Sequence, residues 1–457
     1  MKIAPFLLLA VLSAACMRQE RCQMPICQTA ERLLGSRAKD FVFMLEKQDD
    51  GNEQIKIQSK DKKIEISASS QNALGYGLNW YLNHYCHAQY ARGPKNLILP
   101  DELPVIDSMI VLRASFEKRY YLNYCTYNYS MSWWDWDEWE AELDFMVLHG
   151  INMPLSILGC EKVYFNTLQR LGFSEQEILA FIPGPAYTAW WLMGNLEGYG
   201  GPVSTEWVHE KARLQQRIVQ RMRELDMQPI FQGFYGLMPT TSAAKFPQSR
   251  FINSGKWAGY DRPLLVDPTD SLFQHIASIY YDELEKLYGK ANYYGGDPFH
   301  EGEVAGDINL ALAGGLIQKA MLNHYPEANW VLQNWAENPS DELLQGMDPK
   351  HLVVLDLFGE TQPGWRSREC FSGLKWIWCS INNFGNKVGF HGKPDSIAIA
   401  PMEALAGTCG KNLLGIGIIM EGSDYNAANY ELTFDMLAEF IYFTSHSSPF
   451  PSAGFYL

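Results

Sequence analysis

The chain has 457 residues, more than one hydrophobic core usually supports, so a large domain with at least one smaller domain is expected. Its formal net charge of −15 repels polyanions, which argues against nucleic acid as a partner and against a broad basic surface for sulfated glycans. Aromatic residues make up 13% of the chain, and this excess fits a carbohydrate site, because sugar faces pack on aromatic rings, although most rings in any protein belong to the core.

The N-terminus has the pattern of an export signal, with Lys2 before a short apolar run and small residues before Cys16. This ending resembles a bacterial lipobox, in which the cysteine is lipidated after cleavage, although Ser13 stands where that pattern prefers Leu. A plain signal peptide is the alternative. We expect residues 1–20 to be a signal peptide with a lipobox-like end, and the protein to be exported, as a periplasmic protein or an outer-membrane lipoprotein of a bacterium. Contact with a membrane is expected only through a lipid on Cys16, since no later stretch approaches the roughly 18 apolar residues that a spanning helix needs.

The nine cysteines form no CxxC pair. Their scatter over apolar segments fits buried small hydrophobic residues better than a zinc cluster, and export permits disulfides, with Cys22 a candidate partner of Cys27 or Cys86. The chain has no glycine-rich phosphate loop and no HExxH or similar histidine spacing. We therefore expect no cofactor and no metal.

A small α/β domain is predicted over residues 21–113. Short alternating runs typical of strands cover 40–45, 54–59 and 63–68, and one helical pattern covers 70–85.

The sequence pattern changes near residue 116, where apolar runs typical of strands begin to alternate with helical patterns. The eight predicted strands cover 119–123, 151–157, 228–234, 291–295, 329–333, 352–357, 376–381 and 413–419. The clearest predicted helices cover 136–149, 206–225, 271–288 and 307–323. This alternation predicts a (β/α)8 TIM-like barrel over 114–442, followed by an irregular tail over 443–457. Because the last units have weaker helices, a distorted barrel or an open α/β sheet is the alternative.

In such a barrel the chemistry lies where strands end and the following loops begin. Glu301 follows the fourth predicted strand and Glu421 follows the eighth, so the two would face each other across the mouth. A pair of carboxylates is what glycosidic cleavage needs, one to protonate the leaving oxygen and one to attack or to activate water. Glu421 has an alternative role as an acid at a helix N-terminus. The rival carboxylates, which suit surface charge or structural pairing, are Glu303, Asp356 and Glu360.

Several motifs carry a resemblance to a known family. They include RYYLNYCT at 119–126, WWDW at 133–136, HGINM at 149–153, VLDLF at 354–358 and IWC at 377–379. Together they resemble glycoside hydrolase family 89, the α-N-acetylglucosaminidases, over about residues 30 to 440. The resemblance implies a small α/β domain before a (β/α) barrel, in agreement with the strand count.

The resemblance also implies roles for individual residues. The family's acid/base falls on Glu301 within GDPFHE, and its nucleophile falls on Glu421 within MEG. Some members carry Asn where His300 stands. The implied substrate-binding residues are Asn123, Cys125, Tyr129, Trp190, Trp257, His300, Trp335 and Phe384.

The implied substrate is a glycan with a terminal α-linked N-acetylglucosamine. Its acetamide lies on the same side of the ring as the leaving group and cannot attack from behind, so the enzyme must supply the nucleophile. We expect an exo-acting, retaining double displacement through a glycosyl-Glu421 intermediate, with the two carboxyl groups roughly 5 to 5.5 Å apart. When substrate is bound, the raised pKa is expected on Glu301, while Glu421 stays ionised.

Family members continue beyond the barrel into a large all-helical domain that contributes aromatic residues to the rim of the site, whereas this sequence stops at Leu457. The chain is thus expected to be a truncated member. Two alternatives to an active glycosidase follow from this departure: a sugar-binding lipoprotein and an inactive fragment. Retention of both Glu301 and Glu421 favours the enzyme, because a protein that only binds sugar needs neither an acid nor a nucleophile.

Overall fold

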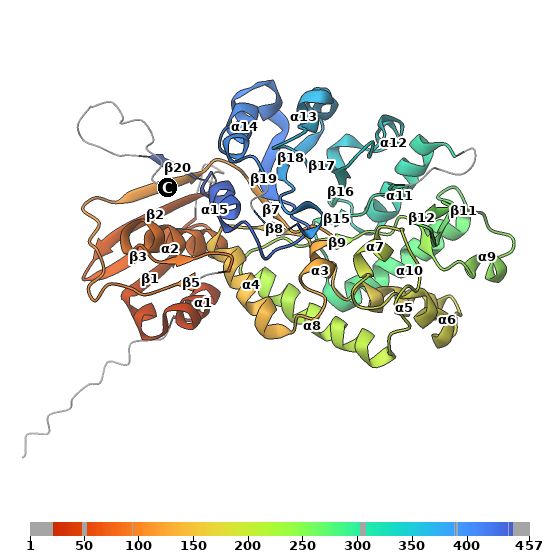
Figure 1. Cartoon of the computed structure of the whole chain (residues 1–457), viewed down its shortest axis with the longest axis horizontal. Coiled ribbons are helices and arrows are strands. Elements are labelled where there is room, and N and C mark those ends of the chain that lie inside the picture. The colour runs from red at the N-terminus through yellow and green to blue at the C-terminus, as the bar shows by residue number, and fades with distance from the viewer. Residues whose placement is uncertain are drawn as a thin grey trace, which may run out of the picture.

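The computed structural model describes residues 22–47, 53–93, 95–301, 308–387, 389, 392–436 and 438–441. The expected signal peptide with Cys16 and the expected tail over 443–457 lie outside the described residues. A small domain made mostly of red and orange elements lies beside a larger barrel whose elements run from orange through green to blue (Figure 1).

The small domain is a five-stranded sheet in the order β1-β3-β2-β6-β20, with helices α1 (Pro25–Leu34) and α2 (Gln71–Cys86). Successive side chains of a strand point to opposite faces of the sheet, so buried and less buried residues alternate along it. In β2, for example, the buried Ile55 and Ile57 flank the less buried Lys56. Helix α2 begins where the Ser70 side chain accepts a hydrogen bond from the backbone N–H of Ala73. The strands are β1 (Phe41–Leu45), β2 (Gln54–Lys60), β3 (Lys63–Ala68), β6 (Ile110–Ala114) and β20 (Ala438–Ile441).

Strand β20 comes from the far end of the described chain and pairs antiparallel with β6. The barrel sequence therefore returns to the small domain after its last strand, and the two domains share a sheet edge. A buried ion pair adds a second connection, because Arg92 of the small domain pairs with Glu142 of the barrel. The Nε of Arg92 also donates to the carbonyl of Ser423 at 2.9 Å, which ties down the segment that follows Glu421.

The barrel has eight parallel strands in the order β8-β7-β19-β18-β17-β16-β15-β9. A parallel bridge between Leu155 and Ile230 joins the two ends of this order and closes the ring. The predicted (β/α)8 barrel is therefore confirmed, and the alternative of an open sheet is wrong. The strands are β7 (Lys118–Tyr121), β8 (Met153–Pro154), β9 (Ile230–Gln232), β15 (Tyr293–Gly295), β16 (Asn329–Asn334), β17 (Leu352–Asp356), β18 (Lys375–Ser380) and β19 (Leu413–Ile418).

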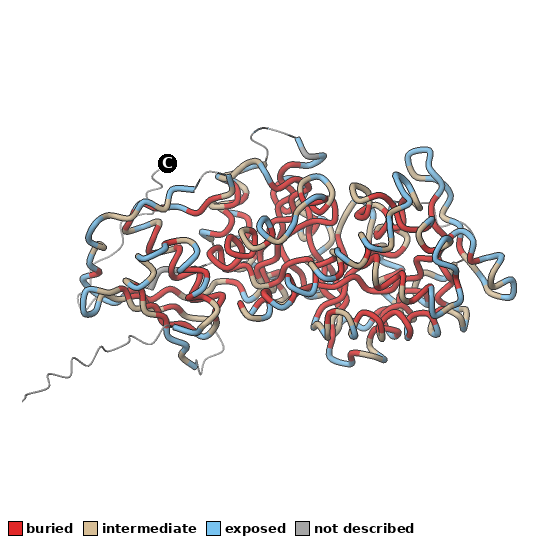
Figure 2. The backbone as a smooth tube through the Cα atoms, turned by 90° about the horizontal axis from the view of Figure 1, so that it is seen from below, coloured by how far each residue is buried: buried red, intermediate tan, exposed pale blue. Residues whose placement is uncertain are grey.

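Large rings are buried on the strands, and buried backbone runs through the middle of the barrel while its outer loops are exposed (Figure 2). Trp330, Trp376 and Trp378 lie on the strands and are fully buried. Helix α4 begins with a capping box of Asp135 and Glu138. The surrounding helices are α4 (Trp136–Leu148), α5 (Cys160–Arg170), α8 (Thr205–Glu224), α10 (Ser271–Tyr288), α11 (Leu310–His324), α14 (Pro394–Ala406) and α15 (Ala427–Asp435). Among the described residues, no helix combines the length and the apolar character that crossing a membrane requires.

Short elements lie in the connections between these strands and helices, and several of them build the mouth of the barrel. The helices are α3 (Thr126–Tyr129), α6 (Glu175–Phe181), α7 (Thr188–Leu192), α9 (Ser242–Lys245), α12 (Asp341–Gln345) and α13 (Gly364–Ser367). The strands are β4 (Gln89–Tyr90), β5 (Lys95–Asn96), β10 (Leu237–Met238), β11 (Phe251–Asn253), β12 (Lys256–Trp257), β13 (Tyr260–Asp261) and β14 (Leu264–Val266).

Two disulfides are present among the described residues. Cys22 pairs with Cys27, one of its two candidate partners. Cys370 pairs with Cys409 and ties together the segments that precede β18 and β19. The interpretation of these two cysteines as unpaired hydrophobic residues is wrong, because folding brings their Cα atoms to 5.3 Å across 39 positions of sequence. The cysteines of the described ranges that form no disulfide are Cys86, Cys125, Cys160 and Cys379, and all four are buried.

Candidate active site

Two glutamates follow strands on opposite sides of the closed barrel. Glu301 comes after β15 and Glu421 comes after β19, which lie four places apart in the ring of eight strands. Both therefore leave the barrel at its C-terminal end, where the active sites of this fold are found.

The Glu301 carboxylate accepts hydrogen bonds from three side chains on three different loops. The indole Nε1 of Trp335 lies 2.8 Å from Oε1, and the indole Nε1 of Trp257 lies 2.9 Å from Oε2. The side-chain amide of Asn195 donates to Oε2 at 3.2 Å. These donors fix the orientation of the carboxylate, while its side chain keeps 29% of its surface exposed and can reach a ligand in the mouth.

The backbone beneath this carboxylate is held by Arg262. Glu301 has φ of 47°, a left-handed conformation that a residue with a side chain rarely adopts. The Arg262 guanidinium donates to the carbonyl of His300 at 2.8 Å and also to the carbonyl of Glu301. Asp297 anchors the start of the same loop, because it accepts from the backbone N–H of Gln333 at 2.7 Å and from its amide at 2.8 Å. The surrounding contacts thus maintain a strained turn that presents Glu301.

The Glu421 carboxylate is buried and accepts a hydrogen bond from the backbone N–H of Gly385, in the loop after β18. Burial raises the pKa of Glu421, the Gly385 N–H opposes this shift, and the negative charge of Glu301 raises the pKa further. The two carboxylates are therefore electrostatic neighbours. In the ligand-free protein, this raised pKa disfavours the ionised form that we expect for Glu421. The raised pKa that we expect on Glu301 when substrate is bound stays a prediction.

The aromatic residues expected to bind sugar surround the two glutamates and remain partly exposed. Trp190 meets Tyr129 edge to face at 5.4 Å between ring centroids. The ring centroids of Trp335 and Phe384 lie 5.6 Å apart. Trp190, Trp257 and Trp335 each pack one side on the core and keep part of their surface accessible, so these rings are placed to contact a ligand.

The remaining expected binding residues, Asn123, Cys125 and His300, are buried. The side chain of Asn123 accepts from the N–H of Cys125 at 3.0 Å and donates to the carbonyl of Ile419 at 3.1 Å, which joins the loop after β7 to the end of β19. Burial raises the pKa of the Cys125 thiol, and Glu421 and Glu301 raise it further, so this thiol lies near both carboxylates. His300 is buried, with Nε2 3.7 Å from Oε1 of Glu301. Direct sugar contacts by these three residues stay predictions.

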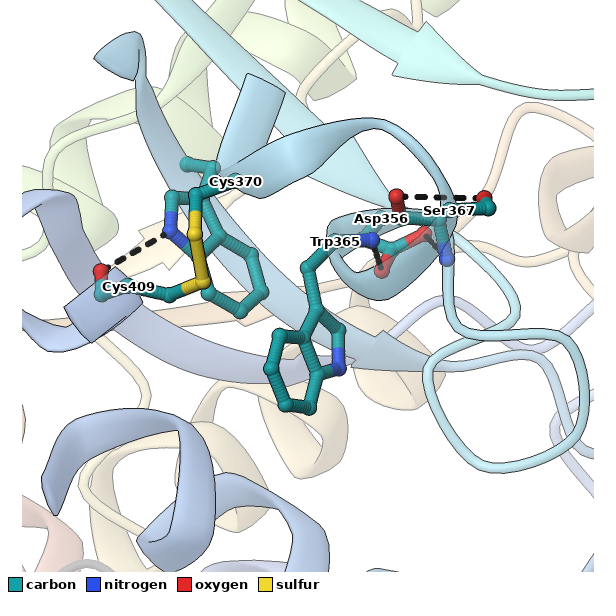
Figure 3. The surroundings of a disulfide bond; sticks show 7 residues. Asp356, Trp365, Ser367, Cys370 and Cys409 are labelled. Carbon is teal, nitrogen blue, oxygen red and sulfur yellow. Dashed lines mark hydrogen bonds between the residues drawn. A yellow bond between two sulfur atoms is a disulfide. The ribbon is translucent and has the colours of Figure 1, made fainter. Parts of the chain in front are cut away.

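Two of the rival carboxylates have structural roles. Asp356, at the end of β17, accepts from the N–H group of Trp365 at 2.9 Å (Figure 3). It also accepts from the N–H group of Gly364 at 3.1 Å and from the Asn334 amide at 3.0 Å. Burial raises the pKa of Asp356 to about 6. Because Asn334 directly precedes Trp335, Asp356 helps to place the indole that binds Glu301.

Glu360 accepts from the N–H of Ile381 at 3.0 Å and thereby connects the loops after β17 and β18. Burial raises the pKa of Glu360 to about 7. The third rival, Glu303, lies outside the described residues. Among the residues that are described, no group of three His, Cys, Asp or Glu side chains is arranged to hold a metal ion.

Sequence reasoning missed three residues that hold the glutamates: Asn195, Arg262 and Gly385. Each lies in a long loop far in sequence from its partner, and ordinary loop composition gives no sign of such a contact. Asn195 and Gly385 carried a usable signal, because the stretches MGNL at 193–196 and NFG at 383–385 also resemble the known family.

Comparisons with known proteins agree with this architecture. The family model described as the tim-barrel domain of alpha-N-acetylglucosaminidase matches residues 119–439, and the model of the corresponding N-terminal domain matches residues 25–105. Human alpha-N-acetylglucosaminidase is 33% identical over 389 residues, which cover 82% of this chain and 52% of the human protein.

Solved structures give the same result. A family 89 glycoside hydrolase from Clostridium perfringens in complex with 2-acetamido-1,2-dideoxynojirimycin superposes with a TM-score of 0.87 at 36% identity, covering 90% of this chain and 48% of that one. The same bacterium's enzyme, with two glutamates replaced by glutamine and bound to its substrate GlcNAc-α-1,4-galactose, matches equally well over 47% of its length. The chain spans about half the length of these relatives.

Proposed function

Because the chain belongs to the alpha-N-acetylglucosaminidase family, we propose that it is an exo-acting, retaining glycoside hydrolase that releases terminal α-linked N-acetylglucosamine from glycans. The proposal rests above all on the pair of electrostatically coupled carboxylates at the barrel mouth, each held by donors from other loops. Glu301 is proposed as the acid/base and Glu421 as the nucleophile.

In the first step Glu301 donates its proton to the glycosidic oxygen, and a carboxylate oxygen of Glu421 attacks C1 from the β face. The bond from C1 to the leaving oxygen breaks, the alcohol departs, and a β-linked glycosyl ester of Glu421 forms. In the second step Glu301 takes a proton from water, whose oxygen attacks C1 from the α face. The ester bond breaks, α-N-acetylglucosamine leaves, and both carboxyl groups return to their starting states.

The surroundings of each carboxyl group suit these roles. The indoles of Trp257 and Trp335 hold Glu301 in one orientation, as repeated proton transfer at a fixed position requires. The Gly385 N–H faces the carboxylate of Glu421, and it is placed to stabilise the charge that returns to this group when the ester breaks. The acetamide of an α-linked N-acetylglucosamine lies on the same side as the leaving group, so a protein nucleophile is necessary for retention.

The substrate-bound relative supports the same assignment. Its substrate is GlcNAc-α-1,4-galactose, and its two substituted glutamates are separated in sequence by nearly the same interval as Glu301 and Glu421. A double displacement requires the two carboxyl groups to lie roughly 5 to 5.5 Å apart.

Because the charge of Glu301 raises the pKa of Glu421, removing that charge is expected to shift the pH dependence of kcat/KM. A nucleophilic carboxylate must be ionised, so kcat/KM falls as the pH decreases through the raised pKa of Glu421 in the free enzyme. Glu301→Gln removes a negative charge that raises this pKa. With a dinitrophenyl α-N-acetylglucosaminide, which needs little acid assistance, we expect the acidic limb of the kcat/KM profile to move to lower pH. An unchanged limb, or a move to higher pH, would contradict the coupling.

The activity itself is tested with paired anomers of one substrate. The purified chain is expected to release 4-nitrophenol from 4-nitrophenyl α-N-acetylglucosaminide and to leave the β anomer intact, because only the α anomer places its leaving group opposite Glu421. Binding of N-acetylglucosamine without any release would instead identify a sugar-binding protein. If a correctly folded chain shows neither, the proposed function is wrong.

We also propose that the protein is exported and anchored in a bacterial membrane by a lipid on Cys16. The supporting observation is the short apolar segment that ends in Ser-Ala-Ala-Cys. In a bacterial host grown with radiolabelled palmitate, the full chain should carry label and sediment with membranes. Cys16→Ala should lose both properties. Label retained by Cys16→Ala, or an unlabelled and soluble native protein, contradicts lipidation at this residue.

A further inference from the structure

A continuous series of aromatic rings borders the site and extends beyond the two glutamates. Tyr187 lies 6.4 Å from Trp190 and 4.7 Å from Tyr199, and Tyr199 lies 4.7 Å from Tyr260. Trp190 lies on α7 and Tyr260 on the β12–β13 hairpin, and both elements lie in the half of the molecule away from the small domain (Figure 1). We call this series the aromatic rim; its members are Tyr129, Trp190, Tyr187, Tyr199, Tyr260 and Trp257.

Both ends of the rim reach the proposed catalytic groups. At one end, burial raises the pKa of the Tyr129 phenol and the charge of Glu421 raises it further, so Tyr129 is within electrostatic range of Glu421. At the other end, the Trp257 indole binds Glu301. Tyr260 stands directly opposite Trp257 across the hairpin, so the two side chains share one face. The hairpin turns through Gly259 at φ of 90°, a conformation that glycine adopts without strain.

The middle of the rim is exposed although its rings contact one another. Tyr199 keeps 36% and Tyr260 keeps 45% of its surface accessible, and their hydroxyl groups lie 3.5 Å apart. Rings that serve only the core are normally buried. Exposed rings held in a fixed series next to a glycosidase site present apolar faces and hydroxyl groups, a combination that suits pyranose rings.

A cavity of about 640 Å³ opens beside these two tyrosines, a size typical of small-molecule sites. Its polar lining includes Glu197, Thr240, Asn253 and Asp261. Asp261 pairs with Lys256 at 3.2 Å, and the Arg262 guanidinium is turned inward to the backbone carbonyls described above. The lining thus offers carboxylates and hydroxyl groups rather than unpaired cations, which favours a neutral ligand over a sulfated one.

We propose that Tyr199, Tyr260 and the adjoining cavity form an additional subsite for the sugars beyond the leaving group, and that its ligand is a neutral oligosaccharide. The inference rests on the proposed function, which places the scissile bond between Glu301 and Glu421. A glycan whose terminal sugar is seated there continues along the aromatic rim, so chains longer than a disaccharide gain contacts that a disaccharide lacks.

The test compares substrates of increasing length in matched variants. The substrates are 4-nitrophenyl α-N-acetylglucosaminide, GlcNAc-α-1,4-galactose and a neutral linear tetrasaccharide that ends in this disaccharide. In the Tyr199→Ala/Tyr260→Ala double variant, the ratio of kcat/KM for the tetrasaccharide to that for the disaccharide is expected to fall about tenfold. The Tyr199→Phe/Tyr260→Phe variant keeps both rings and should retain the native ratio. An unaltered ratio in the alanine variant overturns the subsite.

Further measurements separate this proposal from the proposed function. If the native chain does not cleave the aryl glycoside, the proposed function fails, and binding of the same tetrasaccharide is then measured by calorimetry. Weaker binding by the alanine variant than by the native chain supports the subsite, and equal binding overturns it. A sulfated tetrasaccharide should bind less well than the neutral one; a preference for the sulfated ligand contradicts the assignment of a neutral glycan.

Discussion

Glu421→Ala is expected to lower kcat by about 10⁴-fold or more, because no glycosyl-enzyme can form without its carboxylate. The truncated side chain leaves space beside the Gly385 N–H on the β face of C1. With an activated aryl α-N-acetylglucosaminide, added azide should enter this space, attack C1 directly and restore turnover. The product is then the inverted β-glycosyl azide, which proton NMR distinguishes from the α anomer by the coupling of its anomeric proton.

A matched control is available in the rival carboxylate Glu303. Glu303→Ala should keep near-native activity and form no glycosyl azide, because the proposal gives this residue no chemical role. A retained α-glycosyl azide from Glu421→Ala would show that the roles of the two glutamates are reversed. Full activity of Glu421→Ala without azide would remove this residue from the mechanism.

Glu301→Ala is expected to give a different kinetic signature, because it removes proton transfer and leaves the nucleophile in place. Substrates with poor leaving groups, such as GlcNAc-α-1,4-galactose, should lose about 10²- to 10⁴-fold in kcat/KM. A dinitrophenyl glycoside should lose far less in kcat/KM, because its leaving group departs without a proton. The glycosyl-enzyme should accumulate, since no base remains to activate water in the second step.

Azide again reports the role of the missing group. It needs no general base, so it should release the accumulated glycosyl-enzyme of Glu301→Ala and give an α-glycosyl azide with retained configuration. Equal loss of activity on dinitrophenyl and disaccharide substrates would contradict an acid role for Glu301. An inverted product from this variant would assign the nucleophile to Glu301 instead.

The barrel could be predicted because most of its strands contain a buried apolar run and are separated by long connections. The runs at 329–333 and 352–357 match β16 and β17 closely, since both faces of a parallel strand are buried and leave a strong signal. Strand β8 is much shorter than its predicted run, because its paired residues with β7 end at Pro154, and beyond them only Leu155 forms a bridge, to Ile230 of β9. This count places Glu301 and Glu421 after strands that face each other, whereas the resemblance to the family selects them over the rival carboxylates.

The contacts that orient the site could not be predicted in the same way. The pairing of β20 with β6 and the Cys370–Cys409 bridge join segments whose proximity only the folded chain creates. The Arg262 and Gly385 contacts with the glutamate loops are of the same kind. Hydrophobic periodicity indicates which side of a helix or strand is buried. It does not indicate which distant loop will supply a hydrogen-bond, disulfide or strand partner.

Electrostatics of the site also depends on the fold. A sequence shows that Asp356 and Glu360 are acidic, whereas their buried positions and backbone donors define them as structural groups with raised pKa values. The same holds for Glu421, whose raised pKa arises first from burial and then from the charge of Glu301.

The most direct test of the proposed mechanism is the configuration of the first product that the native chain releases. Proton NMR during rapid hydrolysis of an aryl α-N-acetylglucosaminide separates the anomeric signals of the free sugar before mutarotation mixes them. A double displacement through Glu421 predicts that α-N-acetylglucosamine appears first and that the β anomer follows only as mutarotation proceeds. If the β anomer appears first, the enzyme inverts configuration, and Glu421 is not a nucleophile.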